Sequence, residues 1–184
     1  SEELPPITVR QDFPENWRII LLVNSREKGI HGQKEYNAFK TLKPFPENLS
    51  EKLCRLVNMV ILPSLIEKNF NDFSRAIGKL QKIVGTHFSP IQGGVYSNPD
   101  IANIMSYVEK KGVMGVGQSS WGPTGFILTD SDTAAHKLTK DIRQNFLCKD
   151  LQIEIIQGRN KGSCIEFNNS NKEEQNINLN INKE

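Results

Sequence analysis

Three consecutive amphipathic helical patterns occupy the middle of the chain, and they constrain the fold more than any other feature. In each pattern, apolar residues recur at spacings of three and four, which places them on one face of a helix. The first two helices are expected to pack as a hairpin. We predict that the first helix is capped by Ser50 and kinked at Pro63. The second is expected to begin at a cap formed by Asn71 and Asp72 and to end near Gly85. The third is expected to have Asn98 as its cap and Pro99 at its first position, and to stop at Gly112.

Short strand patterns flank this helical block on both sides. Residues 17–23, WRIILLV, predict a buried strand, and residues 34–42 predict a short helix after a polar loop. Several strands follow one another late in the chain, interrupted by a helix capped by Asp130 or Asp132. We therefore predict an α+β fold, an antiparallel or mixed sheet with helices packed on one face. The later strands are expected at residues 113–116, 125–128, 151–155 and 164–167.

Charge and cysteine content exclude several classes of function. The chain has 23 basic and 21 acidic residues, so its totals indicate no surface for nucleic acid. Its three cysteines are far apart and form no Cys-x-x-Cys pair, which is typical of a reducing compartment. The three histidines lack the paired spacing of a metal site, and no apolar run is long enough to span a membrane. We expect a cytoplasmic protein with no histidine-bound metal.

The chain divides into three predicted parts. Residues 1–14 form a proline-containing connector, residues 15–167 form one domain, and residues 168–184 form a tail in which seven of seventeen residues are asparagine. Such a composition cannot bury an apolar core, so we expect the tail to be disordered. Because the chain opens at Ser1 directly into the connector, we expect it to be part of a longer polypeptide.

The glycine-rich loop at residues 115–124, GVGQSSWGPT, is the best candidate for a ligand-facing segment. Its glycines allow positive φ or close approach to a ligand, its short polar side chains suit phosphate or carboxylate oxygens, and its tryptophan suits a planar ring. A purely structural hairpin whose tryptophan packs on the core explains the composition equally well. The candidate ligand-binding residues are Gly117, Gln118, Ser119, Ser120, Trp121, Gly122 and Thr124.

Two further segments carry candidate site residues. Gln92, Gly93 and Gly94 precede a helix N-terminus and suit either an anion site or a simple helix-to-helix connection. His31 and Glu35 follow the first strand, in a charged loop of the kind that often binds ligands. Ser119 is not in the G-x-S-x-G pattern of a hydrolase nucleophile.

Four segments together resemble a known family. They are IHGQKEYNAF at residues 30–39, NDFSRAIGKLQ at 71–81, QGG at 92–94 and GVGQSSWGPTGF at 115–126. In this order they are similar to the C-terminal half of the β-ribofuranosylaminobenzene 5'-phosphate synthases, within the GHMP kinase superfamily. The resemblance implies a ferredoxin-like plait with an ATP-binding-like superfamily fold, and an N-terminal domain, absent from this chain, that holds the main phosphate loop.

The resemblance also implies a function. Family members are transferases that join phosphoribosyl pyrophosphate to 4-aminobenzoate or 4-hydroxybenzoate with loss of CO₂ and pyrophosphate, in methanopterin-type one-carbon metabolism. Mg²⁺ is the implied cofactor, although no ligands for it are identifiable here. We expect the candidate loop and residues 92–94 to contact substrate, Glu35 to be the only carboxylate candidate for catalysis, and this chain alone to be inactive.

Two alternatives are kept open. In the first alternative, the chain is the C-terminal domain of a small-molecule kinase of the same superfamily. In the second, it is a non-catalytic binding module that uses its sheet and helical hairpin to form a homodimer. The QSSWGPT segment departs from the glycine-dense kinase pattern, which argues against the first alternative.

Overall fold

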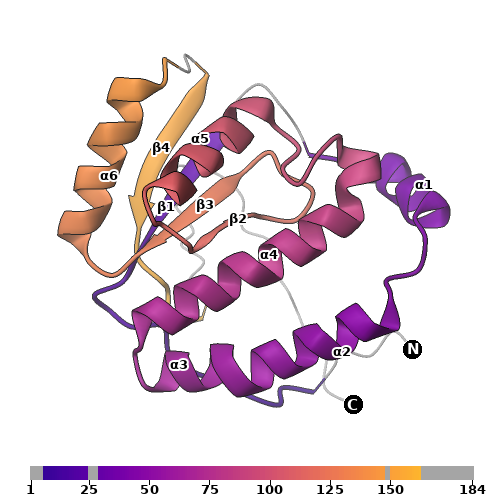
Figure 1. Ribbon diagram of the computed structural model, residues 1–184, viewed down its shortest axis with the longest axis horizontal. Helices are drawn as coiled ribbons and strands as arrows, with labels where there is room; N and C mark the ends of the chain where they lie inside the picture. Colours follow the sequence, from indigo (N-terminus) through magenta and orange to yellow (C-terminus); the bar gives the residue numbers. More distant parts are fainter. Residues whose placement is uncertain (1–5, 25–28, 148–149, 163–184) are drawn as a thin grey trace, which may run out of the picture.

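The computed structural model describes residues 6–24, 29–147 and 150–162. These residues form a sheet of four strands with helices packed around it (Figure 1). The elements, in chain order, are β1 (Arg18–Asn24), α1 (Gln33–Thr41), α2 (Glu47–Leu56), the π-helix η1 (Val57–Ile61), α3 (Leu62–Ile66), α4 (Phe70–Gln92), α5 (Pro99–Lys110), β2 (Val116–Gln118), β3 (Gly125–Thr129), α6 (Asp132–Asn145) and β4 (Leu151–Ile156).

The sheet has the order β2-β3-β1-β4, and all three pairings are antiparallel. The central strand β1 pairs Ile20 with Ile127 of β3 and with Ile155 of β4. The α+β class and the antiparallel sheet are therefore confirmed. The predicted strand at residues 113–116 is shifted, because Gly112 and Val113 still hydrogen-bond to the end of α5 and pairing with β3 begins only at Val116.

Two hydrophobic clusters cover the sheet. In the first, Ile20, Leu22 and Ile127 pack against α5 and α6. In the second, Leu128 and Trp17 pack with Phe73 of α4 and with η1. Since neighbouring residues of a strand point to opposite faces, Ile127 and Leu128 show that both faces of β3 are covered. Thus α5 and α6 cover one face of the sheet, and α4 covers the opposite face beside β2. In the orientation of Figure 1, β2 and β3 lie between α4 and α5.

The helical hairpin is present, but its boundaries differ from the prediction. The first helix begins at Glu47 after Pro46 rather than at Ser50, and Pro63 follows a π-helical turn that divides it. The second helix is capped by the side chain of Asn69, which accepts from the backbone N–H of Asp72. It continues through Gly85 to Gln92, because Gly85 packs directly against Val95 and so stabilises the helix from outside. Burial of that contact outweighs the helix-ending tendency of glycine.

The remaining helices agree more closely with their sequence signals. α5 has the predicted Asn98 cap and Pro99, and it ends just before Gly112, whose φ is +88°. The cap of α6 is Ser131, rather than Asp130 or Asp132, since its hydroxyl accepts from the backbone N–H of Ala134.

Some predictions lie outside the described residues or are untested. The strand at residues 164–167 and the tail at residues 168–184 are outside them. The connector boundary at residue 14 stays a prediction; Phe13 of that segment packs against Trp17 and hydrogen-bonds to Asn160. Within the described part, no helix is long and apolar enough to cross a membrane.

Candidate functional site

The loop between β2 and β3 folds back on itself through backbone hydrogen bonds. The N–H of Ser119 donates to the carbonyl of Thr124, and the N–H of Gly122 donates to the carbonyl of Ser119, both over 2.9 Å. Ser120 and Gly122 have φ values of 50° and 74°, and the Gly122-Pro123 peptide is cis. This tight turn directs the side chain of Trp121 inward, where it is only 6% exposed.

Trp121 joins the loop to α1 and α4. Its indole Nε1 donates to Oε1 of Glu35 on α1 over 3.0 Å. The rings of Phe88 and Phe39 lie edge-on to the indole, with centroids 4.8 and 5.5 Å away. Edge-to-face contacts of this kind stabilise aromatic clusters beyond their area burial. The loop tryptophan is therefore fixed from two sides.

Three glutamine side chains connect the same region into one network. Oε1 of Gln81 accepts from the backbone N–H of Gln118 over 3.1 Å. The side chain of Gln118 accepts from the backbone N–H of Ser97 over 2.7 Å and donates to Oε1 of Gln92 over 3.2 Å. Gln92 in turn donates to the carbonyls that follow α4. Neutral amides thus satisfy the polar groups of this half-buried region without a buried charge.

A cavity of about 270 Å³ lies between the aromatic cluster and the glutamine network. We call it the ring pocket. Among the described residues that line it, Glu35 is the only charged one. The lining consists of Glu35, Phe39, Gln81, Val84, Gly85, Phe88, Gln92, Val95, Gln118, Ser120 and Trp121.

The structure brings some of the candidate residues together and leaves others apart. Glu35, Gln92, Gln118, Ser120 and Trp121 all line the ring pocket. The other candidates do not line it. Gly93 is the C-cap of α4, with a φ of +87°, and Gly94 follows it. Ser119 and Thr124 close the loop through a backbone hydrogen bond. The side chain of His31 is exposed, and its Nδ1 lies 2.7 Å from the carbonyl oxygen of Gly29. Their roles in binding stay predictions.

Two candidate glycines have a packing role that the sequence left open. A Cβ at Gly117 would overlap Gln81 and Phe126, and one at Gly122 would overlap the Ser97 hydroxyl. These glycines let α4 and residues 93–97 approach the loop. The two interpretations of the loop, a structural hairpin and a ligand-facing segment, are therefore compatible. The close packing that requires the glycines also forms one side of the ring pocket.

Sequence reasoning missed the α4 side of the ring pocket. Val84 and Phe88 are one helical turn apart, but the predicted end of the helix at Gly85 concealed that spacing. The missing signal was the apolar repeat continuing beyond Gly85 to Phe88.

Neither titration nor metal ligation adds a further reactive group here. Burial, with a smaller effect of Glu109, raises the pKa of Tyr96 to about 12, so this phenol beside the glutamine network stays protonated at neutral pH. Within the described residues, no three His, Cys, Asp or Glu side chains gather closely enough to hold a metal ion. Among the described lining residues Glu35 is the single carboxylate, and it accepts a hydrogen bond from Trp121, so this donor set does not fit a Mg²⁺ site by itself.

Comparisons with known proteins relate this α+β domain to the GHMP kinases. The family model described as "GHMP kinases C terminal" matches residues 61–147, which span most of the helical block, β2, β3 and α6. The matched residues make up just under half of the chain. The fold agrees: homoserine kinase from Cytophaga hutchinsonii superposes with a TM-score of 0.50 at 15% identity, over 82% of this chain and 44% of that one. Mevalonate diphosphate decarboxylase from Staphylococcus aureus superposes with a TM-score of 0.51 at 13% identity, over 77% and 46%.

Sequence relatives narrow the family further and confirm the resemblance. The chain is 31% identical over 130 residues to "Beta-ribofuranosylphenol 5'-phosphate synthase" of Methanothermobacter thermautotrophicus, covering 71% of this chain and 38% of that protein. It is 28% identical over 165 residues to the protein of the same name from Archaeoglobus fulgidus, covering 88% and 48%. The chain thus spans less than half the length of these relatives.

A kinase is also among the relatives. The chain is 35% identical over 69 residues to "4-diphosphocytidyl-2-C-methyl-D-erythritol kinase" of Gloeothece citriformis, covering 38% of this chain and 22% of that protein. The two synthases match 71% and 88% of the chain, about twice the share that the kinase matches.

Proposed function

We propose that this chain is the C-terminal domain of a synthase-like phosphoribosyl transferase. The proposal is supported by the two synthase relatives, which match 71% and 88% of the chain. Their names specify a phenol, which favours 4-hydroxybenzoate over 4-aminobenzoate as the aromatic acid. The observation on which the proposal depends is the ring pocket, an aromatic-walled cavity at the loop that carries the family resemblance.

The size and lining of the ring pocket suit one aromatic ring. Its volume of about 270 Å³ is near the lower end of the range for ligand sites, which is about 300–1,000 Å³. Trp121 and Phe88 supply apolar walls, and the amides of Gln118 and Gln92 supply hydrogen-bonding groups. The described lining residues offer no cation to a polyphosphate, so we assign the ring pocket to the acceptor ring.

The single charge of the ring pocket orients that ring. One oxygen of Glu35 accepts from Trp121, which leaves acceptor capacity for the hydroxyl of the substrate. The substrate carboxylate is repelled by Glu35 and faces away from it, toward phosphoribosyl pyrophosphate. A hydrogen bond from the hydroxyl to Glu35 also increases electron density at the ring carbon that bears the carboxylate.

The reaction then requires a bond between that ring carbon and the ribose anomeric carbon. Pyrophosphate leaves the anomeric carbon with the bonding electrons, and loss of CO₂ from the same ring carbon returns electrons to the ring. Mg²⁺ would neutralise charge on the pyrophosphate, and the ring-pocket residues do not fit it. We therefore assign the metal and the phosphate grip to a second domain, so this chain alone is inactive.

The proposal is tested in two preparations. The chain of residues 1–184 and the longer polypeptide that includes it are each supplied with phosphoribosyl pyrophosphate, 4-hydroxybenzoate and Mg²⁺, and released pyrophosphate and CO₂ are measured. We expect equimolar release by the longer polypeptide and none by residues 1–184. Turnover by residues 1–184 contradicts the two-domain assignment, and no turnover by a folded longer polypeptide contradicts the function.

A kinase is the second candidate, because the Gloeothece citriformis relative is one. Release of ADP from ATP that depends on an alcohol substrate would favour it. A non-catalytic, homodimeric binding module is the third, and it predicts that the longer polypeptide releases neither pyrophosphate nor ADP.

A further inference from the structure

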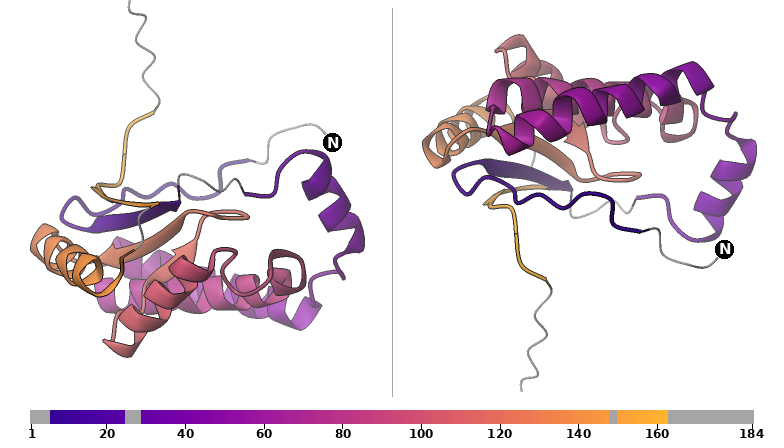
Figure 2. Two further views of the ribbon diagram at one scale, coloured as in Figure 1. Left: turned by 90° about the horizontal axis from the view of Figure 1, so that it is seen from above. Right: turned by 90° about the horizontal axis from the view of Figure 1, so that it is seen from below.

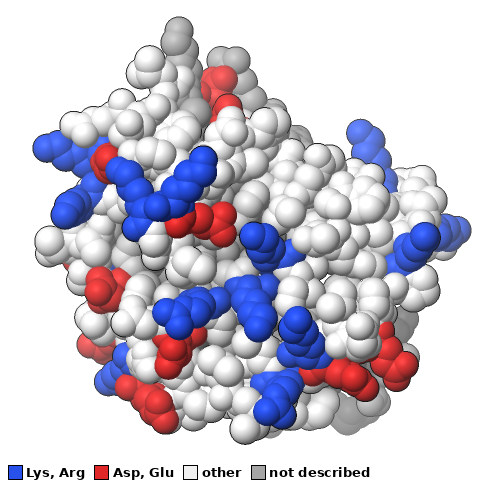
Figure 3. All heavy atoms as spheres, in the orientation of Figure 1, with Lys and Arg blue, Asp and Glu red and all other residues white. Residues whose placement is uncertain are grey.

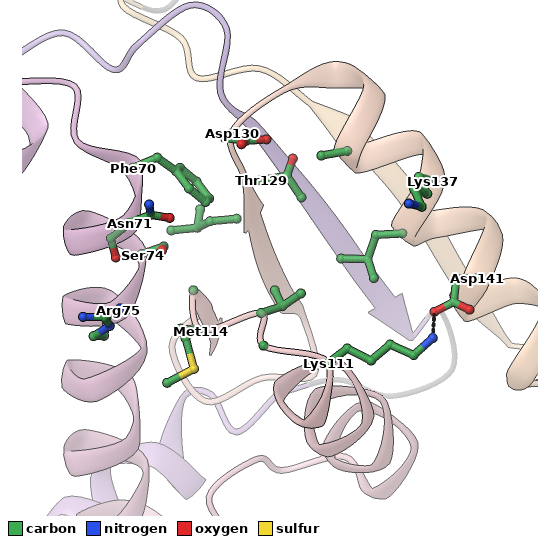
Figure 4. A pocket seen from close by; sticks show the side chains of 16 residues that line it. Phe70, Asn71, Ser74, Arg75, Lys111, Met114, Thr129, Asp130, Lys137 and Asp141 are labelled. Atoms are coloured by element: carbon green, nitrogen blue, oxygen red, sulfur yellow. Dashed lines mark hydrogen bonds and ion pairs between the residues drawn. The ribbon is translucent and has the colours of Figure 1, made fainter.

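A second and larger cavity lies at the opposite end of β2 and β3 from the ring pocket. Its volume is about 550 Å³, well within the range of small-molecule sites. Figure 4 shows it between the first turns of α4, the end of α5 and the side of α6. We call it the α4–α6 cavity. The proposed transferase chemistry uses none of its residues.

The floor of the α4–α6 cavity is apolar. Leu128 of β3, Val113 after α5 and Leu138 of α6 contribute aliphatic side chains, and Phe70 supplies an aromatic wall from α4. Met114 also lines it and is 45% exposed, although methionine is usually buried. An apolar group that entered the cavity would remove this surface from water, which is favourable.

Cations surround this floor from all three helices. Arg75 projects from α4, Lys111 from α5 and Lys137 from α6, while the carboxylates of the lining are Asp130 and Asp141. The Lys111 ammonium is already paired with Asp141 over 2.6 Å, and Asp130 accepts from the Ser131 hydroxyl. Within the described part of the chain, Arg75 and Lys137 make no ion pair within 4 Å, although Lys137 is near enough to Asp141 to help lower its pKa. With three cations and two carboxylates, the described lining keeps a net positive charge.

The positive charge continues beyond the rim of the cavity. Lys79 and Lys82 follow Arg75 at spacings of four and three along α4, and all three are exposed. Lys and Arg side chains gather across the middle of this face of the molecule (Figure 3). Residues 6–17 run along the back of the molecule as it is oriented in Figure 1, so they do not cover this face (Figures 1 and 2). Phe13 and Trp17 of this segment pack against Phe73 of α4 from behind. The surrounding field favours an anion at the rim over a cation.

We propose that the α4–α6 cavity binds an amphipathic organic anion, with an apolar chain or ring on the Leu128 floor and a carboxylate or phosphate head at Arg75, while Lys137 on the facing wall adds to the positive field (Figure 4). The guanidinium of Arg75 offers a planar pair of donors suited to either head group. The apolar floor distinguishes this ligand from inorganic phosphate, and the cations distinguish it from a neutral lipid. The cavity is therefore a site separate from the ring pocket in both place and chemistry.

The test uses octyl phosphate and octanoate as probes, titrated into residues 1–184 by calorimetry, with inorganic phosphate and octanol as matched half-ligands. We expect saturable binding of at least one amphiphile and at least tenfold weaker binding of both half-ligands. The stronger amphiphile identifies the head group. Equal binding of inorganic phosphate, or no amphiphile binding at millimolar concentration, contradicts the proposal.

Two matched pairs of variants locate the site. Arg75→Gln is expected to weaken amphiphile binding about tenfold, because it removes a charge-assisted contact, whereas Lys79→Gln on the same exposed face outside the lining changes it less than twofold. Ala134→Phe fills the cavity and is expected to abolish binding, whereas Thr133→Phe, outside the lining, is not. If neither Arg75→Gln nor a folded Ala134→Phe alters binding, the amphiphile binds elsewhere and the assignment is wrong.

Discussion

The two cavities share one wall and differ in almost everything else. α4 runs along both: its first turns line the α4–α6 cavity with Asn71 and Arg75, and its last turns line the ring pocket with Phe88 and Gln92. The first is wide and bordered by cations, and the second is half as large and has one carboxylate. A single helix thus presents charge to one ligand site and neutral amides with aromatic rings to another.

The difference shows what each site can stabilise. Neutral amides and edge-on rings hold a flat, weakly charged group in a fixed orientation, as acceptor chemistry requires. Exposed cations around an apolar floor attract an anion but impose less orientation, which suits binding rather than catalysis. Between the α4 residues that line the two cavities lies Gly78, which packs against the backbone of Met114 in the segment before β2.

The largest effect on stability is expected at this contact between α4 and the segment before β2. A Cβ at Gly78 would overlap the backbone carbonyl of Met114, so Gly78→Ala forces α4 away from β2. We expect the free energy of unfolding to fall by about 2 kcal/mol, since overpacking a close backbone contact outweighs the better helix propensity of alanine. Chemical denaturation measures it.

The control is Gly162→Ala, where an added Cβ meets no atom within 4 Å and φ is not positive. Its change should stay within about 0.5 kcal/mol. Equal stability of the two variants would mean that α4 is not held against β2 by this contact, and the two cavities would not share a rigid wall.

The success of sequence reasoning was also uneven along α4 and its neighbours. Asn98, Pro99 and Gly112 delimited α5 correctly, because capping depends on groups within one turn of the helix end. Gly85 was misread as an end, because the contact that keeps it helical comes from Val95 in a later segment. Local signals predicted local structure, and tertiary packing decided the rest.

The site shows the same division. The resemblance drew attention to Trp121 and Glu35 separately, but no spacing in the sequence indicates that residues 86 positions apart share a hydrogen bond. The α4–α6 cavity was not predicted at all. Its charges come from three helices, so no single segment carries a motif for it.

The largest effect on activity distinguishes the two cavities. In the longer polypeptide, Trp121→Ala removes the wall that Glu35 and Phe88 hold in place, and kcat/KM for 4-hydroxybenzoate is expected to fall about 100-fold through loss of positioning. Met114→Ala, in the lining of the other cavity, should change it less than twofold. Unchanged activity in a folded Trp121→Ala variant would remove the ring pocket from the transferase site.

A smaller effect distinguishes charge from support within the ring pocket. Glu35→Gln keeps an oxygen that accepts from Trp121 but loses the negative charge that we assign to the substrate hydroxyl. We expect kcat/KM to fall about tenfold, the size of one charge-assisted hydrogen bond, while the unfolding midpoint stays constant. Glu47→Gln on α2, outside the pocket, is the matched control. If both variants retain full activity, Glu35 only supports the tryptophan.

The smallest effect concerns the ion pair at the rim of the α4–α6 cavity. The hydrogen bond from Lys111 lowers the pKa of Asp141 in the folded protein, and Tyr107 also donates to this carboxylate. A depressed pKa contributes stability that is present above the unfolded-state pKa and is lost as pH falls through the folded-state pKa. Asp141→Asn should therefore lower the thermal midpoint slightly at pH 7, and the difference from wild type should shrink on acidification below pH 4. A difference that stays constant from pH 7 to pH 3 would show that Asp141 acts by packing, and its charge would then not offset Lys111 at the anion site.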